Sequence, residues 1–482
     1  MKFDVHYGSG IQKVNIPDTC RFEVLEGREV PGVDEERVMR KALEHPLGSR
    51  GLDEFLNGGK LLIVVNDGDR PTPTPKFLAP LIDRIQNRPD TKILVACGTH
   101  RMPSQEDLHL IFGRFYELLK DKVSFHQAKD RESLMSFGTT KLGNEILMNK
   151  LVGWADKLLI TGSVEPHYFA GFTGGRKWVI GVAGFDTLER NHKLSLRPET
   201  AALALEGNPL HEELVEWDGM IKKEKFCINV VLDRNMAIAA AFAGDITRVF
   251  EECVKVGTKM YSAMTEGNAD IVLTVARPPQ DSNLYQALKA QEHGKLAMRN
   301  GGIIILVAEC HLGLGPSHFI DMLKDMDLEV LMRNIEKDFH LGEHKIAKLV
   351  NTLKRGRVWV VTDVPADDVA SVQMERFGDV QEALDKAIAI MGKNAKVIFL
   401  PDGGMTVPHV VKEIPARTAV KIVARAVAKG VRKRVAKRTS KVRAKVRARV
   451  RGRVRKVRGR VRRGIALVRK ARKNVRGRAK RK

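Results

Sequence analysis

The chain has 482 residues, 43% of them hydrophobic, which is enough for two or three globular domains with their own cores. Its net charge of +25 does not make the whole chain a nucleic-acid binder, because residues 421–482 hold 30 Lys or Arg and no acidic residue, and the rest carries a net charge of −5. Five scattered cysteines without a CxxC pair argue against disulfides and structural zinc. The sequence also shows no apolar leader and no apolar run of ~20 residues, so we expect a soluble, cytoplasmic body without a transmembrane segment.

Eight short apolar runs, each bounded by turn residues, predict strands that are buried on both faces. They are rich in β-branched residues and do not alternate with polar ones, which is typical of parallel sheets. The runs lie at residues 61–69, 92–100, 157–166, 226–233, 269–279, 301–310, 357–365 and 395–404. Amphipathic segments at 245–264 and 379–392 predict helices between strands. The alternation of the two patterns predicts an α/β fold with largely parallel sheets.

Two boundaries divide the predicted fold. The segment TEGNAD near residue 265 separates a predicted helix from a new strand, and a second boundary follows EIP near residue 415. We therefore predict one α/β domain at 1–265, a second at 266–415 and a Lys/Arg-rich tail at 416–482. Several strands run directly into loops that carry His, Asp or Arg. Ligands of open α/β sheets bind beyond the carboxyl ends of the strands, so these loops are candidates for a binding site.

The loop NDGDRPTPTP, residues 66–75, follows the first apolar run. One interpretation is a capped helix start, in which Asp precedes Pro and Thr hydroxyls accept backbone N–H groups. The other makes Arg70 a fork for a carboxylate or phosphate, oriented by Asp67. The next run ends in CGTHRMP, where His100 is either a hydrogen-bonded structural residue or an imidazole exposed at the edge of the sheet.

The segment EPHYFAGFTGGRKWVIGVAGFDTLERNH, residues 165–192, is too interrupted by glycine, proline and aromatic residues to be a plain core helix. It contains His167, Lys177 and His192. Its GFTGGRK part is not a phosphate-binding P-loop, because an arginine precedes the lysine and a tryptophan follows it. The backbone N–H groups of residues 173–175 remain candidates for an anion nest. The alternatives are a solvated surface lysine and a histidine that only caps a helix.

The segment PPQDSNLYQALKAQE predicts a helix whose first turn is capped by Ser282 or Asn283. Tyr285, Gln286 and Lys289 fall in the first two turns of this helix. A phenol, an amide and an ammonium near a helix N-terminus make a plausible carboxylate site, helped by the helix dipole. Without further context, an ordinary amphipathic surface is the alternative.

Taken in chain order, these segments resemble the nickel-dependent lactate racemase family. The matching motifs are DxxRP from Asp67, GTHR from Gly98, PHxxAGFxGGxK from Pro166, NH at Asn191 and NxYQAxK from Asn283. Five motifs in one order are far more specific than any of them alone. The resemblance covers approximately residues 1–415 and does not include the tail.

The resemblance implies a cofactor, the nickel-pincer nucleotide, which is a pyridinium-3,5-bisthiocarboxylic acid mononucleotide carrying nickel. It implies covalent attachment at Lys177 through a thioamide and nickel ligation by His192, with Asp67 and Arg70 shaping the cofactor pocket. Three pincer donors and one imidazole make the planar four-ligand set that Ni(II) favours. The enzymes that synthesise the cofactor are implied partners.

The resemblance also implies a reaction at the interface of the two α/β domains. His100 and His167 match the paired acid and base. Arg70, Tyr285, Gln286 and Lys289 match the residues that hold the substrate. The implied reaction is racemisation or epimerisation of a small 2-hydroxy acid, of which lactate is one candidate. A histidine moves the hydroxyl proton while the Cα hydride moves reversibly to the cofactor.

The basic tail is a separate element. Its valines recur at spacings of three, four and seven, which predicts one face of a helix, whereas residues 442–454 alternate as a strand would. Charge repulsion and the weak helix propensity of valine predict disorder in isolation and a helix on a polyanion. The alternative function of the chain is therefore nucleic-acid or anionic-surface binding through residues 421–482, with a catalytically silent body.

Overall fold

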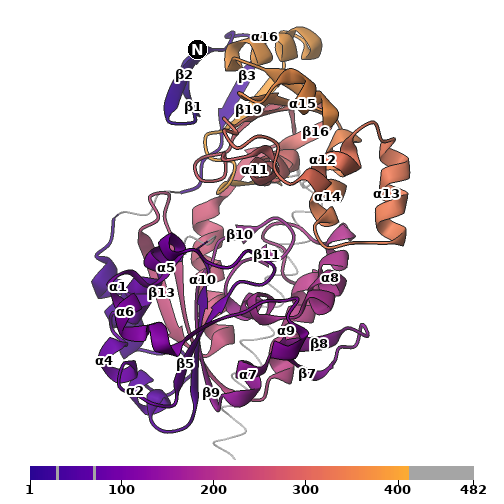
Figure 1. Cartoon of the computed structure of the whole chain (residues 1–482). Helices are drawn as coiled ribbons and strands as arrows, with labels where there is room; N and C mark the ends of the chain where they lie inside the picture. Colours follow the sequence, from indigo (N-terminus) through magenta and orange to yellow (C-terminus); the bar gives the residue numbers. More distant parts are fainter. Residues whose placement is uncertain (29–31, 69–71, 412–482) are drawn as a thin grey trace, which may run out of the picture. The chain divides into compact units, whose positions relative to one another are not determined.

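The structure, a computed structural model, describes residues 1–28, 32–68 and 72–411 (Figure 1). The predicted tail at 416–482 and Arg70 therefore lie outside the described residues. Residues 1–411 form one unit by their mutual contacts. Within the described part of the chain, no helix has the length and apolar character needed to cross a membrane.

The first half of the chain builds a six-stranded sheet with the order β13-β12-β9-β4-β5-β6. Its neighbouring strands are all parallel except β12 and β13, which are antiparallel. The strands are β4 (Leu61–Asn66), β5 (Thr91–Ala96), β6 (Val123–Phe125), β9 (Lys157–Ser163), β12 (Glu224–Leu232) and β13 (Ile238–Gly244). Because β9, β4 and β5 are parallel neighbours, the loops that leave their carboxyl ends share one edge of the sheet.

The helices of this half are α1 (Glu35–Glu44), α2 (Leu52–Leu56), α3 (Thr74–Leu78), α4 (Ile82–Ile85), α5 (Gln105–Phe112), α6 (Tyr116–Leu119), α7 (Lys150–Trp154), α8 (Phe185–Lys193), α9 (Pro209–Met220) and α10 (Ile246–Tyr261). Short 3-10 helices are η1 (Gly113–Phe115), η2 (Lys120–Lys122), η3 (Arg131–Ser133), η4 (Gly175–Val182) and η5 (Leu194–Leu196). Two antiparallel hairpins complete the half, β7 (Leu134–Thr139) with β8 (Glu145–Asn149) and β10 (Pro166–His167) with β11 (Gly171–Phe172).

The second half builds another six-stranded sheet, with the order β18-β17-β16-β15-β19-β3 and only parallel pairs. Its strands are β3 (Arg21–Val24), β15 (Ala269–Val275), β16 (Met298–Val307), β17 (Arg357–Val361), β18 (Glu375–Phe377) and β19 (Lys396–Leu400). Its helices are α11 (Leu284–Ala297), α12 (Ser317–Leu323), α13 (Leu328–Lys337), α14 (Glu343–Leu353), α15 (Ala366–Ser371) and α16 (Val380–Met391). A separate parallel pair joins β14 (Ser262–Glu266) to β20 (Val407–Val411).

Both sheets are buried on their two faces, as the runs of apolar residues predict. In β4, Leu61 and Ile63 point into one core, and Leu62 and Val64 point into the core on the opposite face. Each buried side chain of this size contributes about 1.5–3 kcal/mol to the burial term. All eight predicted strands are present, and the helices predicted at 245–264 and 379–392 are α10 and α16. The predicted α/β class with largely parallel sheets is confirmed.

The N-terminal residues belong to the second sheet, which the predicted division near residue 265 does not foresee. The hairpin of β1 (Lys2–Tyr7) and β2 (Gly10–Asn15) places Val5 and Val14 in the same core as Ile271 of β15. Strand β3 then pairs with β19 at the edge of this sheet. Such a long-range pairing leaves no signal in local sequence, because a short edge strand looks like any other.

Candidate active site

Three neighbouring parallel strands of the first sheet each lead into a predicted site residue. Asp67 follows β4 directly, His100 lies four residues after β5, and His167 lies four residues after β9. The three residues therefore start from the same edge of the sheet. This is where an open α/β sheet binds its ligands.

Asp67 and His100 form a hydrogen-bonded pair. The Oδ2 atom of Asp67 lies 2.5 Å from Nδ1 of His100, and Asp67 is buried whereas the imidazole is 36% exposed. A carboxylate can only accept, so Nδ1 of His100 donates and Nε2 keeps the lone pair when the ring is neutral. The loop that carries His100 is fixed by its backbone, because Gly98 N donates to Gly181 O at 3.0 Å.

His167 has the opposite hydrogen-bonding pattern. It lies in the β10–β11 hairpin, where Ala170 N donates to its Nδ1 at 3.3 Å. An Nδ1 that accepts a bond leaves the proton of the neutral ring on Nε2. The ring stacks on Tyr168, with centroids 5.1 Å apart, and meets the ring of Phe169 edge-on at 4.4 Å. These contacts fix the plane of the imidazole.

Lys177 lies at the start of η4, directly after a turn that requires glycine. Gly174 and Gly175 have φ angles of +69° and +49°, in the left-handed region. A Cβ atom at Gly174 would lie 2.7 Å from Ser163 O, and one at Gly175 would lie 2.4 Å from the Phe250 ring. The GG pair is therefore explained by backbone conformation and close packing, and it delivers the half-buried Lys177 to the strand edge.

A buried contact to α9 holds η4 in place. Trp178 Nε1 donates to Asp218 Oδ1 at 3.0 Å, and Lys225 Nζ forms an ion pair with the same carboxylate at 3.0 Å. Trp178 and Asp218 are both buried. The residue next to Lys177 is thus fixed by a charged hydrogen bond, which fixes the backbone from which Lys177 extends.

His192 lies in the last turn of α8 with its Nδ1 atom 2.9 Å from Leu188 O. A carbonyl only accepts, so Nδ1 donates and Nε2 carries the lone pair. Burial and then the charge of Lys177 lower the pKa of His192 to about 4, while the bond to Leu188 opposes the shift. Lys177, the predicted anchor of the cofactor, is thus one of the charges that act on His192, the predicted nickel ligand.

A buried polar network supports α8 beside His192. Asn191 Nδ2 donates to Glu213 Oε2 at 2.6 Å, and Thr140 Oγ1 donates to Glu213 Oε1 at 3.1 Å. Burial raises the pKa of Glu213, and the bonds from Asn191 and Thr140 oppose this. The asparagine of the NH motif therefore positions α8 and does not face a ligand with its amide nitrogen.

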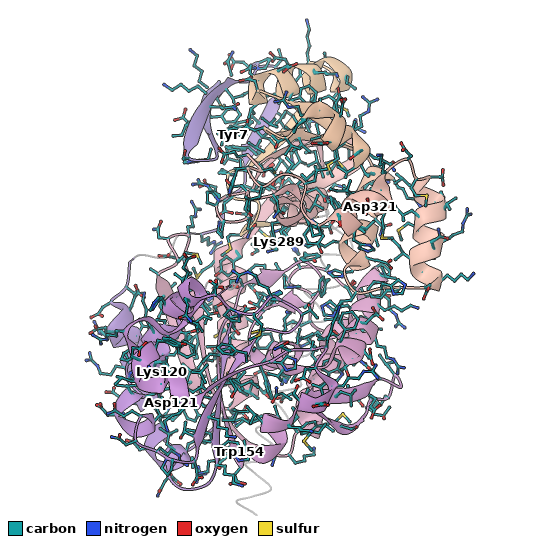
Figure 2. All side chains as sticks on the ribbon, viewed as in Figure 1. Tyr7, Lys120, Asp121, Trp154, Lys289 and Asp321 are labelled. Atoms are coloured by element: carbon teal, nitrogen blue, oxygen red, sulfur yellow. The ribbon has the colours of Figure 1, made fainter. Side chains whose placement is uncertain are left out.

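The predicted helix with the carboxylate site is α11. Asn283 caps it, since its Oδ1 accepts from Gln286 N at 2.9 Å. Tyr285 packs its ring on Phe319 with centroids 5.5 Å apart, and burial raises its pKa. Gln286 and Lys289 are half-buried on the same helix. Figure 2 labels Lys289, which locates this part of α11.

Helix α14 contributes residues to the site that lie outside the five sequence motifs. His344 lies with its ring centroid 5.3 Å from that of His192 and 5.1 Å from that of Phe169. The next residue, Lys345, places Nζ 3.6 Å from the ring centroid of Tyr285 and donates to Tyr285 O at 2.9 Å. Consecutive residues of α14 thus contact the predicted metal ligand in the first half and the predicted substrate residue in the second.

Two further hydrogen bonds join the α14 region to the first half. Lys348 Nζ donates to Thr200 O at 2.8 Å, and Leu341 N donates to Glu189 Oε2 at 2.8 Å. Burial lowers the pKa of Lys348 to about 8. Burial and the neighbouring cations lower the pKa of His344 well below its usual value.

Comparisons with known proteins identify the family. Residues 7–203 match the family described as lactate racemase N-terminal domain, and residues 264–407 match the lactate racemase C-terminal domain. The lactate racemase of Thermoanaerobacterium thermosaccharolyticum is 31% identical over 83% of this chain and 97% of its own length. The lactate racemase of Lactiplantibacillus plantarum is 32% identical over 77% of this chain and 90% of its own length.

This chain belongs to the lactate racemase family. The structure of the lactate racemase apoprotein from T. thermosaccharolyticum superposes with a TM-score of 0.79 and 29% identity, and covers 85% of this chain and 100% of that one. The family resemblance predicted from five motifs is therefore confirmed. So is the predicted fold class.

The cofactor that the resemblance implies takes one imidazole donor from the protein, and His192 offers its Nε2 atom. No group of three or more His, Cys, Asp or Glu side chains suited to a metal is present among the described residues.

Some details of the sequence interpretation need correction. The loop at 173–175 is not an open anion nest, because Thr173 N donates to Glu165 O and Gly175 N donates to Asn229 Oδ1. Helix α3 begins without a side-chain cap, which does not support the capped start, one of the two interpretations of the loop at 66–75. Asp67 pairs with His100. Its predicted pairing with Arg70 lies outside the described residues.

The sequence interpretation missed two groups in this racemase-family site. The pairing of Asp67 with His100 has a sequence signal in retrospect, since each residue follows one of two adjacent parallel strands. His344, Lys345 and Lys348 have none, because they look like the polar side of an ordinary amphipathic helix. Only the packing of α14 against Phe169 and Tyr285 reveals them.

Proposed function

We propose that this protein racemises or epimerises a 2-hydroxy acid, with lactate as the first candidate, using a nickel-pincer nucleotide attached to Lys177. The substrate class is supported by the relatives, which are lactate racemases. The observation that carries the proposal is the complementary hydrogen bonding of two histidines. His100 donates through Nδ1 to Asp67, whereas His167 accepts through Nδ1 from Ala170. In neutral rings, the first offers a lone pair at Nε2 and the second offers a proton.

The two histidines then divide the proton transfers. His100 removes the hydroxyl proton of one enantiomer, and the carboxylate of Asp67 stabilises the imidazolium that forms. His167 gives its Nε2 proton to the oxygen of the keto acid when the opposite enantiomer is formed. After this turnover His100 holds the proton that it took and His167 lacks the one that it gave, which is the state that the reverse reaction requires. Proton exchange with solvent restores the starting state. A racemase needs two proton carriers prepared in this complementary way.

The cofactor would be held by Lys177 and His192. When bound, it supplies the acceptor that takes hydride from the substrate Cα and returns it to the other face. His192 would ligate nickel through Nε2, because Nδ1 donates to Leu188. A pKa of about 4 keeps this imidazole neutral at physiological pH, which is the form that binds metal.

The substrate carboxylate would be held from α11. Tyr285 lies one residue after the start of this helix and Lys289 one turn later, with Gln286 beside them. A phenol, an amide and an ammonium near a helix N-terminus favour an anion. Arg70 would add a bidentate contact from the loop after β4. Holding the carboxylate allows the planar keto acid to present either face without leaving the site.

The test is production of the protein together with the cofactor-synthesis enzymes. We expect nickel in the purified protein, an increased mass on the peptide that contains Lys177, and loss of optical purity when D- or L-lactate is added. Lys177→Arg should abolish the mass increase, and His192→Gln should lower nickel content while the adduct on Lys177 remains.

Two matched variants serve as controls, Lys259→Arg on the exposed side of α10 and His109→Gln on the exposed side of α5. Both should keep the adduct, the nickel and the activity. An unmodified Lys177 without nickel in the wild-type protein, under conditions that load a known lactate racemase, would refute the proposal.

A further inference from the structure

His344 is a buried imidazole with an unsatisfied nitrogen. Its side chain is 8% exposed and is surrounded by the rings of Phe169, His192 and Tyr168, at centroid distances of 5.1, 5.3 and 6.4 Å. Within the described residues, its Nδ1 atom has no hydrogen-bond partner. Leaving a buried polar atom unpaired is costly, so its partner is expected from a molecule that binds in the site.

A structural histidine in the same protein looks different. His126 is also fully buried, but both ring nitrogens are engaged by the chain. Its Nε2 lies 2.9 Å from Ala183 O, and its Nδ1 lies 3.3 Å from Asn149 Nδ2. The contrast indicates that His344 is not placed to complete the internal hydrogen bonding of the protein.

The surroundings of His344 favour an anionic partner. Two cationic side chains of the same helix, Lys345 and Lys348, act on His344. An oxygen with negative charge is therefore stabilised at this position, whereas a methyl group would leave Nδ1 unpaired. The position is also within the proposed site, because Lys345 in the same helical turn covers Tyr285.

We propose that His344 determines substrate specificity by donating from Nδ1 to a second carboxylate of the substrate. The preferred substrates are then 2-hydroxy dicarboxylic acids, with the first carboxylate on α11 and the second at α14. This inference rests on the proposed function, since it concerns the same pocket. A site built to hydrogen-bond a group discriminates strongly against an analogue that lacks it.

The test compares two substrates and three variants of the nickel-loaded enzyme. Loss of optical purity is followed with D-lactate and with D-malate, which carries the second carboxylate. We expect kcat/KM to be at least tenfold higher for malate. In His344→Phe the ratio of malate to lactate should fall about 10- to 100-fold, mainly through a higher KM for malate. In His344→Asn, whose amide nitrogen replaces Nδ1, most of the preference should remain.

The control variant is His318→Phe, which changes an exposed histidine on α12 and should leave the ratio unchanged. A second measurement does not depend on turnover. Succinate has two carboxylates and no hydroxyl, so its binding to the loaded enzyme can be measured by calorimetry beside propionate, which has one. We expect succinate to bind at least tenfold more tightly, and His344→Phe to remove the difference while thermal unfolding confirms that the variant is folded.

The outcomes separate the two proposals. If lactate is racemised but malate is not preferred, or if His344→Phe lowers both rates equally, the role of His344 is refuted and the proposed function stands. If the nickel-loaded enzyme racemises neither acid, the proposed function fails. In that case, succinate binding no tighter than propionate binding would also refute the second carboxylate site.

Discussion

The two sheets of this protein are built alike, yet they contribute residues to the candidate site from different kinds of element. Each has six strands, is largely or wholly parallel and is buried on both faces. In the first half, the candidate groups Asp67 and His100 lie on loops just beyond strand ends, and His167 lies in the short β10–β11 hairpin that follows β9. In the second half, Tyr285 and His344 lie in the first turns of α11 and α14, the helices labelled in Figure 1.

This difference in the supporting elements follows from the chemical role that we propose for each set of residues. The loops of the first half are fixed by backbone hydrogen bonds, such as Gly98 N to Gly181 O, and can present an imidazole in one orientation and one tautomer. A proton carrier needs this precision. The helices of the second half present longer, cationic side chains, such as Lys289 and Lys345, which suit a carboxylate. The comparison predicts that variants of the loops lower turnover and that variants of the helices change which substrate binds.

The strongest test of this comparison is removal of either histidine. His100→Gln and His167→Gln should each lower kcat of the nickel-loaded enzyme by about 10²- to 10⁴-fold, because a positioned histidine contributes that much to proton transfer. Optical purity of lactate, followed over time, gives the rate. The exposed His109→Gln on α5 is the control. A loss of less than tenfold in either variant would show that the loops do not carry the acid and base.

Asp67→Asn should have the next largest effect. The amide keeps the size of the side chain but carries no charge, so it cannot stabilise a protonated His100 as the carboxylate at 2.5 Å does. We expect kcat to fall about 10²-fold while nickel content stays at the wild-type level. Asp53→Asn, at an exposed ion pair with Arg84, should change neither quantity. Loss of nickel in Asp67→Asn would instead assign Asp67 to the cofactor.

Lys348 offers a test of the contact between the halves through pH. Burial lowers the pKa of Lys348 from 10.5 to about 8. Below pH 8 the amine is therefore protonated in both the folded and the unfolded protein, and burial of its charge destabilises the folded state. Between pH 8 and 10.5 the folded state releases the proton first, and stability rises with pH relative to Lys348→Met. The rise is at most about 3 kcal/mol. Urea unfolding of both proteins between pH 7 and 10 measures it, and a constant difference would contradict the burial of this amine.

Glu213→Leu should destabilise the first half by about 1–3 kcal/mol. The substitution leaves Asn191 Nδ2 and the Thr140 hydroxyl without their acceptor in a buried environment. Thermal or urea unfolding measures the change in free energy of unfolding. Glu251→Leu on the exposed side of α10 should stay within about 0.5 kcal/mol of wild type. If the two variants were equally stable, the network beside His192 would not hold α8.

The smallest effect on catalysis is expected from removal of the basic tail. A chain that ends at residue 415 should racemise lactate at the wild-type rate, because every candidate site residue precedes that point. Binding of the full chain to DNA or RNA should weaken steeply with salt, and the shortened chain should not bind. Binding that persists in residues 1–415 would refute the assignment of this interaction to the tail.

Local sequence was a good guide to the elements of this fold. Apolar runs without alternation predicted eight strands, and a helix cap was predicted at Ser282 or Asn283, of which Asn283 is the one observed. The order of five motifs predicted the family. Strands, helices and caps depend on residues that are close together in the sequence. Gly174 and Gly175 can be read from the sequence for a different reason, since a Cβ atom at either position would clash with its surroundings.

Tertiary structure alone decided the rest. The pairing of Asp67 with His100, the approach of His344 to His192, and the addition of β3 to the second sheet join residues that are far apart in sequence. Such contacts depend on how whole elements pack, and an imidazole on an amphipathic helix has the same local pattern whether it meets water or another ring. The sequence by itself determined which segments form strands, helices and glycine turns, since burial and backbone sterics are local demands. Only the packing of these elements determined which polar groups meet, because that depends on distance in space and not on spacing in the chain.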